Sequence, residues 1–396
     1  MIAAARPTDC DLVLGGVPRF APEAAWARRI LARYARQIPC RTRSEAWERR
    51  PLVSDAAGDA PLVLVAADPE AFLLPAAAAR LIESLRGRPE ADLLLPVTNE
   101  PLFEEARAAP SHPYVTLSML ERCVREFAAL PQAPLAVSAA RSPVYLARRR
   151  VFEGLPPSLP LDAVPEEAAR TGRAVAVDPG AYVHRYGPMN RQARPDLVAL
   201  VPEGARAVLD VGCARGETAE TLRARGVAYL AGIEPDEEDA RAARRVFDHV
   251  VAASLESVRE AWGGRFDAIL FGDVLEHLVD PAAALERVRP WLSPGGVVVA
   301  SVPNVGHWAV VSDLVEGRFD YVPYSLLSGT HVRFFTRQTL RDLFASCGYR
   351  VERVQTLTLP ASPEDSARLA LLSTLPGASP DLGVAEFLLV ARSADA

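Results

Sequence analysis

The sequence predicts an α/β protein built from two domains. Along its 396 residues, short apolar segments alternate with stretches of helical periodicity, which is the order found in sheets that carry helices on their faces. A chain of this length has room for two or three domains at about 100–200 residues each. Asp210, Gly212 and Gly216 form a glycine-rich turn between a predicted strand and a predicted helix, which is typical of open sheets that bind a ligand.

In the N-terminal half, short apolar runs predict strands, and apolar residues recurring every three to four positions predict helices. The predicted strands are residues 11–15, 61–67, 91–96, 143–147 and 173–178. The predicted helices are residues 24–37, 76–86 and 165–171. Because strands alternate with helices, we expect a mostly parallel sheet with helices on its faces.

The segment 185–195 is predicted to connect the domains because it contains Gly187, Pro188 and Pro195. The first domain then comprises residues 1–186 and the second comprises residues 187–396. The second domain is predicted to contain strands at 207–211, 229–234, 248–252, 266–272, 296–302, 349–358 and 386–391. Its predicted helices are 196–201, 217–225, 237–246, 281–292 and 337–347.

Composition limits the classes of function. Hydrophobic residues make up 49% and charged residues 24% of the chain, as in ordinary globular proteins with buried cores. The net charge is −6 without a basic cluster, so we expect no nucleic-acid partner, since phosphate binding needs clustered cations. All 44 basic residues are arginine, which excludes a Schiff-base lysine and a phosphate-loop lysine.

The cysteines and the hydropathy pattern bear on the compartment. The five cysteines are scattered and form no C-x-x-C pair, so neither a zinc site nor a disulfide framework is expected. No apolar run approaches the roughly 18 residues needed to span a bilayer, and the N-terminus lacks the apolar region of a signal peptide. We therefore expect a cytoplasmic protein without a membrane span.

Two polar features suggest a nucleotide-like ligand in the second domain. A glycine-rich turn lets backbone N–H groups approach a ligand without a Cβ in the way, although a tight strand–helix turn also favours glycine for purely structural reasons. The next predicted strand ends in Glu234, where a carboxylate can accept both ribose hydroxyls of an adenosine-bearing cofactor. A solvated surface acid is the alternative, because the acidic run 235–238 follows.

A third segment, Phe266-Asp-Ala-Ile-Leu-Phe-Gly-Asp-Val-Leu-Glu-His277, completes the set. With the runs 301–308, 317–321 and 330–336, it resembles class I S-adenosylmethionine-dependent methyltransferases of the ubiquinone-biosynthesis type and their relatives encoded with bacterial surface-polysaccharide enzymes. The resemblance covers about half of the chain and implies a doubly wound, seven-stranded Rossmann-like sheet in the second domain. A dehydrogenase, whose glycine turn cradles a pyrophosphate, becomes a remote alternative.

The resemblance implies S-adenosyl-L-methionine as the cofactor, held by residues at the strand ends. These residues are Asp210, Gly212, Cys213, Gly216, Glu234, Pro235, Ser254, Leu255, Gly272 and Asp273. Two positions depart from the family pattern. Ala214 replaces the middle glycine of the turn, and the loop at 253–256 lacks the acidic residue that often meets the adenine amine, so that Ser254 or the Leu255 backbone would take its place.

Methyl transfer from a sulfonium depends largely on alignment and desolvation, and a hydroxyl acceptor also needs a base. His277, His307 and His331 are the predicted catalytic residues, because histidine suits this role near neutral pH, with a packed histidine as the alternative for each. Relatives of the ubiquinone type bind a divalent cation through an acid–x–x–Glu–His cluster, which Asp273, Glu276 and His277 match. Mg²⁺ or Mn²⁺ is compatible with these ligands, but the run also occurs as a structural turn, so we assign no metal ligand.

Four residues are predicted to contact the acceptor. Trp308, Tyr321 and Tyr324 can stack on a sugar or an aromatic ring, with core packing as the alternative. Arg333 can orient an anionic acceptor, with a surface ion pair as the alternative.

In the N-terminal half, the segments 61–68, 144–152 and 172–184 in series resemble a family-two glycosyltransferase of the GT-A fold. In that family a strand ends in D-x-D, which holds a divalent cation on a nucleotide diphosphate. This chain keeps only Asp68 of the pair, and Asp162 and Glu166 only roughly fill the region of the acidic base. One carboxylate holds a cation and a diphosphate poorly, so we expect a degenerate, non-glycosylating domain. A generic α/β domain is the alternative.

Together these observations predict an enzyme that methylates a small-molecule or sugar acceptor, such as a polysaccharide precursor, on oxygen. One alternative is a bifunctional glycosyltransferase and methyltransferase. Another is a non-catalytic scaffold that binds S-adenosylmethionine. The sequence leaves a homo-oligomer open.

Overall fold

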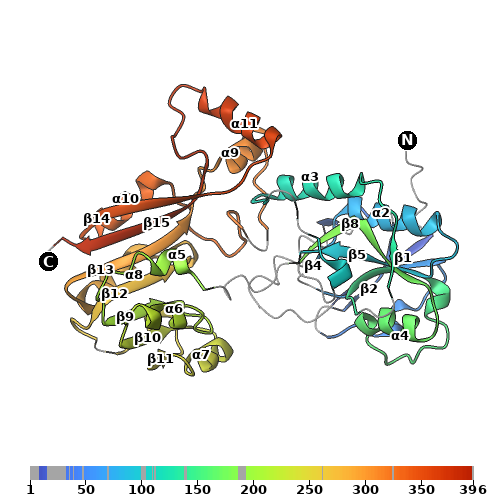
Figure 1. The fold of residues 1–396 in the computed structure, drawn as a ribbon, viewed down its shortest axis with the longest axis horizontal. Helices are drawn as coiled ribbons and strands as arrows, with labels where there is room; N and C mark the ends of the chain where they lie inside the picture. Colours follow the sequence, from blue (N-terminus) through green and yellow to red (C-terminus); the bar gives the residue numbers. More distant parts are fainter. Residues whose placement is uncertain are drawn as a thin grey trace. The chain divides into compact units, whose positions relative to one another are not determined.

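A computed structural model provides the fold. It describes residues 9–15, 33–34, 36–38, 40–46, 49–68, 71–99, 104–108, 110, 113–137, 141–185, 193–260, 262–322 and 325–394. The chain divides into two compact units (Figure 1). The first contains Met1–Gly187 and Asp320–Ser325, and the second contains Pro188–Phe319 and Leu326–Ala396. The helix predicted at 24–37 lies largely outside the described residues, although Arg33 and Tyr34 are helical.

The first unit is organised around one mixed sheet. In its described residues the strand order is β2-β1-β3-β7-β5-β8-β4, with β6 paired to β8. The strands are β1 (Cys10–Gly15), β2 (Arg41–Ala46), β3 (Leu62–Ala66), β4 (Ala71–Phe72), β5 (Leu93–Thr98), β6 (Leu135–Ala136), β7 (Val144–Arg148) and β8 (Val175–Arg185). The helices are α2 (Pro75–Arg86), α3 (Leu117–Ala128) and α4 (Val164–Arg170).

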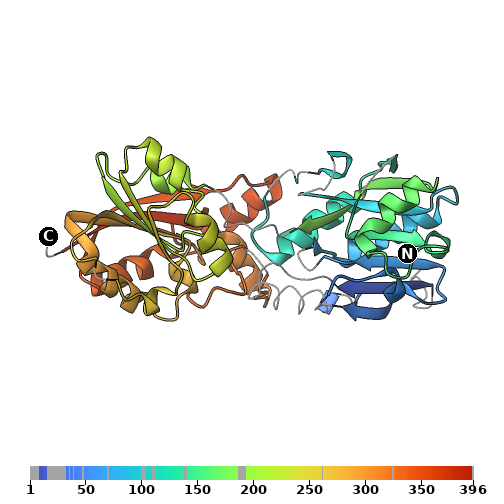
Figure 2. The same ribbon diagram turned by 90° about the horizontal axis from the view of Figure 1, so that it is seen from below.

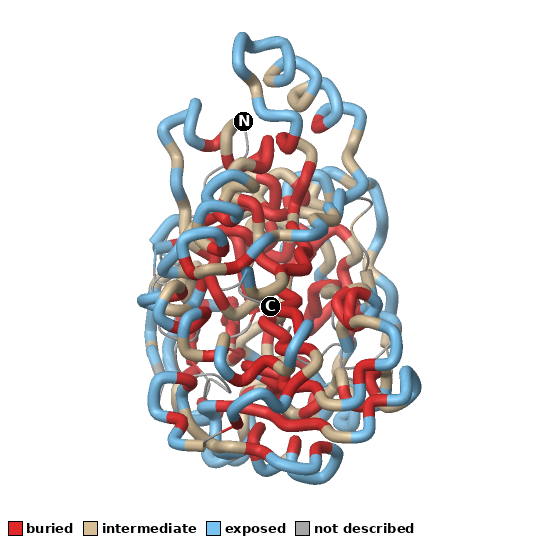
Figure 3. The backbone as a smooth tube through the Cα atoms, turned by 90° about the vertical axis from the view of Figure 1, so that its left-hand side faces the viewer, coloured by how far each residue is buried: buried red, intermediate tan, exposed pale blue. Residues whose placement is uncertain are grey.

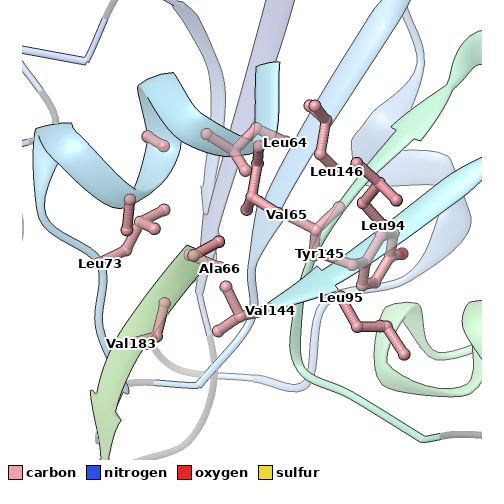
Figure 4. Close-up of a cluster of buried hydrophobic side chains, with 14 of the residues drawn as sticks. Leu64, Val65, Ala66, Leu73, Leu94, Leu95, Val144, Tyr145, Leu146 and Val183 are labelled. Carbon is pink, nitrogen blue, oxygen red and sulfur yellow. The ribbon is translucent and has the colours of Figure 1, made fainter. Parts of the chain in front are cut away.

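Strand direction differs from the mostly parallel sheet that the sequence predicts. Strand β1 pairs in parallel with β2 and β3, and β5 pairs in parallel with β8. Strand β7 lies between these groups and runs antiparallel to both β3 and β5. Because β7 is buried on both faces, its apolar sequence is the same as that of a parallel strand and does not encode direction. Figure 4 shows the core that results, where Leu146 of β7 lies between its cross-strand neighbours Leu64 of β3 and Leu94 of β5.

The second unit contains a seven-stranded sheet, within its described residues, in the order β11-β10-β9-β12-β13-β15-β14. The strands are β9 (Ala207–Val211), β10 (Tyr229–Ile233), β11 (His249–Val251), β12 (Phe266–Gly272), β13 (Leu292–Pro303), β14 (Tyr349–Thr358) and β15 (Val384–Ser393). The helices are α5 (Pro195–Val198), α6 (Ala219–Ala224), α7 (Glu237–Ala243), α8 (Pro281–Val288), α9 (Trp308–Val315), α10 (Arg337–Ser346) and α11 (Pro363–Ser373). Strand β15 is antiparallel to both β13 and β14, and the other pairs are parallel.

Successive side chains of a strand point to opposite faces of the sheet, so alternate residues pack into two separate hydrophobic cores. In β12, Ile269 and Phe271 pack on the face that α8 and α10 cover, whereas Ala268 and Leu270 pack on the face that α5, α6 and α7 cover. Figure 2 shows helices on both sides of this sheet, and Figure 3 shows buried segments of the chain with exposed segments around them. The second unit is therefore an α/β Rossmann-like layer structure.

The parallel strands place their carboxyl ends at one edge of the sheet. The turns that follow β9, β10 and β12 therefore meet at this edge, which is where open α/β sheets bind ligands. None of the helices in the described part of the chain is long and apolar enough to cross a membrane. All five cysteines are free thiols.

Candidate active site

The turn after β9 requires glycine for two reasons. Gly212 and Gly216 adopt φ values of +74° and +93°, a region that side chains with a Cβ rarely enter. A Cβ on Gly212 would also lie 2.7 Å from Cγ2 of Val274, which belongs to the turn after β12. The two turns thus pack directly on each other. Ala214, the departure from the family pattern, adopts φ +46° without glycine.

Glu234 joins the end of β10 to this turn. Its Oε2 accepts a hydrogen bond from the Ala214 amide at 2.9 Å, and its Oε1 accepts one from the Asp236 amide at 2.8 Å. Burial raises the pKa of Glu234, while these two backbone hydrogen bonds act to lower it. Each carboxylate oxygen has two lone pairs, so one remains on each oxygen for a ligand hydroxyl. The residue therefore fits the role of binding a ribose.

Asp210 is a buried acid at the end of β9. It accepts a hydrogen bond from Oγ1 of Thr218 at 2.6 Å. Burial, helped by the charges of Glu234 and Glu217, raises the pKa of Asp210 to about 7, although the bond from Thr218 acts to lower it. The acid is thus close to half protonated at neutral pH.

The other predicted cofactor residues lie along the same edge with different exposure. Cys213 is buried, and its Sγ occupies the space that a Cβ on Gly232 would need. Leu255 is buried, whereas Pro235 and Ser254 are exposed and available to a ligand. Gly272 adopts φ +80°, directly before Asp273. The structure brings these residues to one edge, and their roles in binding stay predictions.

A charged network that the sequence did not predict lies beside the turn after β12. Asp273 accepts a hydrogen bond from Oγ of Ser301 at 2.9 Å and forms an ion pair with Arg194. Arg194 also pairs with Asp196 at 2.9 Å and with Glu386 at 2.6 Å. Burial, with the charge of Asp273, raises the pKa of Glu386 to about 7, although Arg194 acts to lower it. Asp273 and Glu386 lie 79 and 192 residues from Arg194 in the sequence, so no local sequence pattern could have predicted these two ion pairs.

Glu276 is a buried carboxylate in the same turn. Its residue is 1% exposed, and neither of its side-chain oxygens has a hydrogen-bond partner among the described residues. Its backbone carbonyl accepts the amides of Val332 and Arg333 at 2.9 and 3.0 Å, which ties residues 326–333 to the turn. Burial, together with the charges of Asp273 and Glu386, raises the pKa of Glu276 well above its usual range.

Two of the three predicted catalytic histidines lie at this carboxylate. Nδ1 of His277 lies 3.2 Å from the carbonyl oxygen of Thr330, and Nδ1 of His331 lies 3.2 Å from that of Leu326. A carbonyl only accepts, so each Nδ1 carries a proton. The two rings meet edge to face with centroids 4.8 Å apart. Burial and the neighbouring His277 lower the pKa of His331 to about 4, so it is neutral at pH 7.

The third histidine has a different environment. His307 is the N-cap residue of α9, and its Nδ1 accepts the Ala309 amide at 3.3 Å. It is 3% exposed, and burial lowers its pKa to about 4. Trp308, predicted to stack on an acceptor, is also buried. These contacts favour structural roles for both residues.

The other three residues that were predicted to contact the acceptor are found in different parts of the chain. Tyr321 belongs to the first unit, and Tyr324 lies outside the described residues. Arg333 is exposed and donates to the carbonyl oxygens of Val332 and Val279, and its backbone amide donates to the carbonyl oxygen of Glu276. Of the four, Arg333 alone is placed near Glu276 by a contact in the described chain.

In the first unit, the acids expected from the glycosyltransferase resemblance are already paired. Asp68 is 8% exposed and accepts a hydrogen bond from Nε of Arg185 at 2.9 Å. Asp162 pairs with Arg50 at 2.5 Å, and Glu166 pairs with Arg141 at 3.0 Å.

Comparison with known proteins agrees with the geometry of the second unit. A family described as a methyltransferase domain matches residues 180–354. An uncharacterised methyltransferase of Mycobacterium tuberculosis is 30% identical over 155 residues, which cover 37% of this chain and 78% of that protein. The ubiquinone biosynthesis O-methyltransferase of Psychrobacter arcticus is 31% identical over 155 residues, covering 36% of this chain and 58% of that protein. The human mitochondrial enzyme of the same name is 28% identical over 158 residues, covering 37% and 42%.

Among solved structures, an S-adenosylmethionine-dependent methyltransferase from Archaeoglobus fulgidus matches 50% of this chain and 90% of its own, with 18% identity and a TM-score of 0.38. One from Mesorhizobium loti matches 50% and 96%, with 21% identity and a TM-score of 0.35. The chain spans about half the length of the ubiquinone enzymes that it matches.

The strand order is that of an α/β Rossmann-like sheet, and the glycine turn and the carboxylate at the end of β10 lie at the edge where such sheets bind ligands. With the sequence relatives, they establish that the chain belongs to the class I S-adenosylmethionine-dependent methyltransferases. It is an enzyme of this family, and the family implies S-adenosylmethionine as its methyl donor.

Proposed function

We propose that this enzyme methylates a hydroxyl oxygen of a small-molecule or sugar acceptor. The observation that carries the proposal is the pair His277 and His331: the turn that contains His277 packs on the glycine turn through Val274, and the two imidazole rings have centroids 4.8 Å apart. A hydroxyl must lose its proton as its oxygen attacks. His277 is the candidate base, because the lowered pKa of His331, about 4, makes that imidazole a weak base near pH 7. Relatives named as O-methyltransferases support the same reaction.

In this proposal the cofactor lies along the edge formed by the turns after β9, β10 and β12. Glu234 binds the ribose hydroxyls with its two remaining lone pairs. The backbone of the turn at Gly212 contacts the amino acid end of the cofactor, and Ser254 with Leu255 lies against the adenine. The sulfonium then lies near Asp273 and the histidine pair.

The reaction is a displacement at carbon. The acceptor oxygen attacks the methyl carbon, the carbon–sulfur bond breaks, and S-adenosylhomocysteine leaves with the electron pair of that bond. The acceptor's proton passes to an imidazole of the histidine pair and then to solvent. Alignment of the three centres in a dry pocket provides much of the rate.

Transfer of a labelled methyl group to a panel of phenols, catechols and sugars, with amines of similar size, tests the proposal. We expect label on hydroxyl acceptors and a kcat for His277→Gln that is about 100-fold lower, the usual scale for losing a general base. S-adenosylhomocysteine affinity should not change in this variant. His249→Gln is the matched control, because His249 is an exposed histidine that contacts Glu260 and Trp262. Label on amines alone, or bound cofactor product without turnover on any acceptor, contradicts the proposal.

For the first unit, we propose a GT-A-like domain that no longer transfers sugars. The pairing of Asp68 with Arg185 supports this, because a carboxylate held by a guanidinium is a poor cation ligand. Calorimetric titration with a uridine diphosphate sugar, with and without Mn²⁺, should give no binding heat. Manganese-dependent binding would instead favour the bifunctional alternative.

A further inference from the structure

Two cysteines of the first unit lie on neighbouring strands, although they are far apart in the sequence. Cys10 begins β1, and Cys40 directly precedes β2. The two strands pair in parallel with Asp11 opposite Arg41, two residues that are 30 positions apart. The cysteines lie one position earlier on each strand, so they are neighbours as well. Adjacent strands are about 4.8 Å apart, which lies within the roughly 4.4–6.8 Å that separates the Cα atoms of a disulfide.

The two thiols share one face of the strand pair. Nε of Arg41 donates a hydrogen bond to Oδ1 of Asp11 at 3.1 Å, so these two side chains lie on the other face. Successive side chains of a strand alternate between faces, which places Cys10 and Cys40 together. Cys10 is fully buried in the core of the first unit, and the half-buried Cys40 packs against the same core. A hydrogen bond between the two thiols, with burial, raises the pKa of Cys40 well above its usual value, although Arg86 acts to lower it.

A link at this position would fasten the most weakly held strand of the sheet. Strand β2 is the edge strand in the described residues, and β1 is its partner there. Residues 41–45 of β2 are half-buried or exposed, so the strand gains little from apolar burial. Arg41 and Arg43 pair with Asp59, whose side chain is 81% exposed, and exposed ion pairs contribute little to stability.

We propose that Cys10 and Cys40 are a redox-sensitive pair that hydrogen peroxide oxidises to a disulfide and that a dithiol reductant restores. The sulfur of Cys40 attacks one peroxide oxygen, the oxygen–oxygen bond breaks, and the leaving hydroxide takes the thiol proton to form water. The sulfur of Cys10 then attacks the sulfenic acid on Cys40, and the sulfur–oxygen bond breaks as the disulfide forms, releasing a second water. The two thiols lose two electrons and two protons in total, and one peroxide is reduced to two waters.

The disulfide would act on both the folded and the unfolded chain. In the folded chain it fastens the start of the edge strand β2 to β1. In the unfolded chain it closes the segment between the two cysteines into a loop, which restricts the conformations of that state. Oxidation should therefore stabilise the first unit. The inference is independent of the acceptor that the second unit methylates.

Peroxide treatment of the folded full chain, followed by digestion without reduction and mass spectrometry, tests the inference. We expect a Cys10 peptide joined to a Cys40 peptide, with the loss of two hydrogens. Thiols counted in denaturant should fall from five to about three, and dithiothreitol should restore them. Because the thiolate is the reactive form and the pKa of Cys40 is raised, the bond should form over minutes to hours rather than seconds.

Variants of the two cysteines provide the controls. Cys10→Ala and Cys40→Ser should each abolish the joined peptide, and Cys40→Ser changes a half-buried position, so it tests the pair even where Cys10→Ala does not fold. Cys123→Ser is the matched control, because Cys123 is a buried cysteine on α3 of the same unit, and it should leave the joined peptide unchanged. In hydrogen exchange, amides of β2 should exchange at least about fivefold more slowly after oxidation of the wild type, but not after the same treatment of Cys40→Ser.

Three results would overturn the pairing of Cys10 with Cys40. These are five thiols that survive peroxide treatment, a disulfide that joins Cys40 to another cysteine, and a joined peptide that forms only after the chain is unfolded in urea. A Cys10–Cys40 disulfide that leaves the exchange of the β2 amides unchanged overturns its role in fastening the edge strand.

Discussion

At the scale of single residues, Asp210 should link stability to pH. Its folded pKa of about 7 lies above the unfolded value of about 3.9, so the unfolded state releases the proton first. Stability of the second unit should therefore fall as pH rises from about 4 to about 7. Asp210→Asn removes the cost of ionising this buried carboxyl and keeps a hydrogen-bond acceptor for Thr218. We expect it to gain about 3 kcal/mol more at pH 8 than at pH 5, measured by urea unfolding.

Asp248→Asn is a control of opposite sign for this prediction. Burial acts to raise the pKa of Asp248, but its bonds from the Leu230 amide and from Arg223 lower the pKa overall. That variant should lose stability at pH 8. Equal pH profiles for wild type and Asp210→Asn would contradict the burial argument. Cofactor affinity should fall in Asp210→Asn, because residues in binding sites commonly lower the stability of the protein while they contribute to its function.

The residues that sequence could predict are those in local patterns. Glu234 and the glycines follow buried strands at fixed spacing, and the structure places them together. Arg194 and Glu386 carry no such pattern, because their partnership depends on how distant strands meet. The anchoring of His277 and His331 was equally out of reach, since it depends on carbonyl groups of residues 326–330.

At the scale of elements, the contact between the turns after β9 and β12 should make Gly212 irreplaceable. Gly212→Ala places a Cβ at φ +74° and 2.7 Å from Val274. The left-handed backbone alone costs about 1–2 kcal/mol, and the clash adds to it. We expect lower stability in urea unfolding and weaker binding of S-adenosylhomocysteine. Adding Val274→Ala should relieve the clash and restore part of the loss.

Gly226→Ala separates backbone strain from the effect on the site. Gly226 adopts φ +88°, and an added Cβ would meet no atom within 4 Å. This variant should lose about 1–2 kcal/mol but keep its affinity for S-adenosylhomocysteine. The account of the turn is wrong if Gly212→Ala and Gly226→Ala weaken binding equally.

Element prediction succeeded where periodicity was clear and missed elements elsewhere. All seven strands of the second unit were expected near their observed bounds. The apolar runs of buried strands such as β9 and β12 explain this for the centre of the sheet, whereas β14 is mostly exposed. Strand β2 was missed because Arg41–Ala46 is polar and charged, and its side chains pair with Asp11 and Asp59. Helices α3, α9 and α11 were not predicted.

At the scale of the whole molecule, the chain crosses between its units more often than one linker requires. Asp320–Ser325 belongs to the first unit, although it lies between α9 and α10 in sequence. Val322 is 2% exposed in the first unit's core, and Oγ of Ser325 donates to the Val115 carbonyl at 2.8 Å. The predicted division into 1–186 and 187–396 does not assign Asp320–Ser325 to the first unit, because a segment of six residues has no composition that would indicate its domain.

Val322→Asp should therefore destabilise the N-terminal unit, although it lies within the methyltransferase half of the sequence. Burying an unpaired carboxylate typically costs several kcal/mol. In hydrogen exchange measured by mass spectrometry, amides of β3 and β7 should exchange faster, and those of β9 and β12 should not. Val315→Asp is the matched control, because Val315 is 78% exposed on α9. Faster exchange confined to β9 and β12 would contradict this assignment.

The central claim is that the second unit binds S-adenosylmethionine between the turn after β9 and Glu234. Calorimetric titration of the full chain with S-adenosylhomocysteine tests it most directly. A hydrogen bond to a charged group contributes about 1.5–3 kcal/mol, so Glu234→Ala should weaken binding about 10- to 100-fold. Glu238→Ala, an exposed acid on α7, should bind as wild type does. The account is contradicted by a wild-type chain that binds no S-adenosylhomocysteine at millimolar concentration, or by Glu234→Ala binding as tightly as wild type.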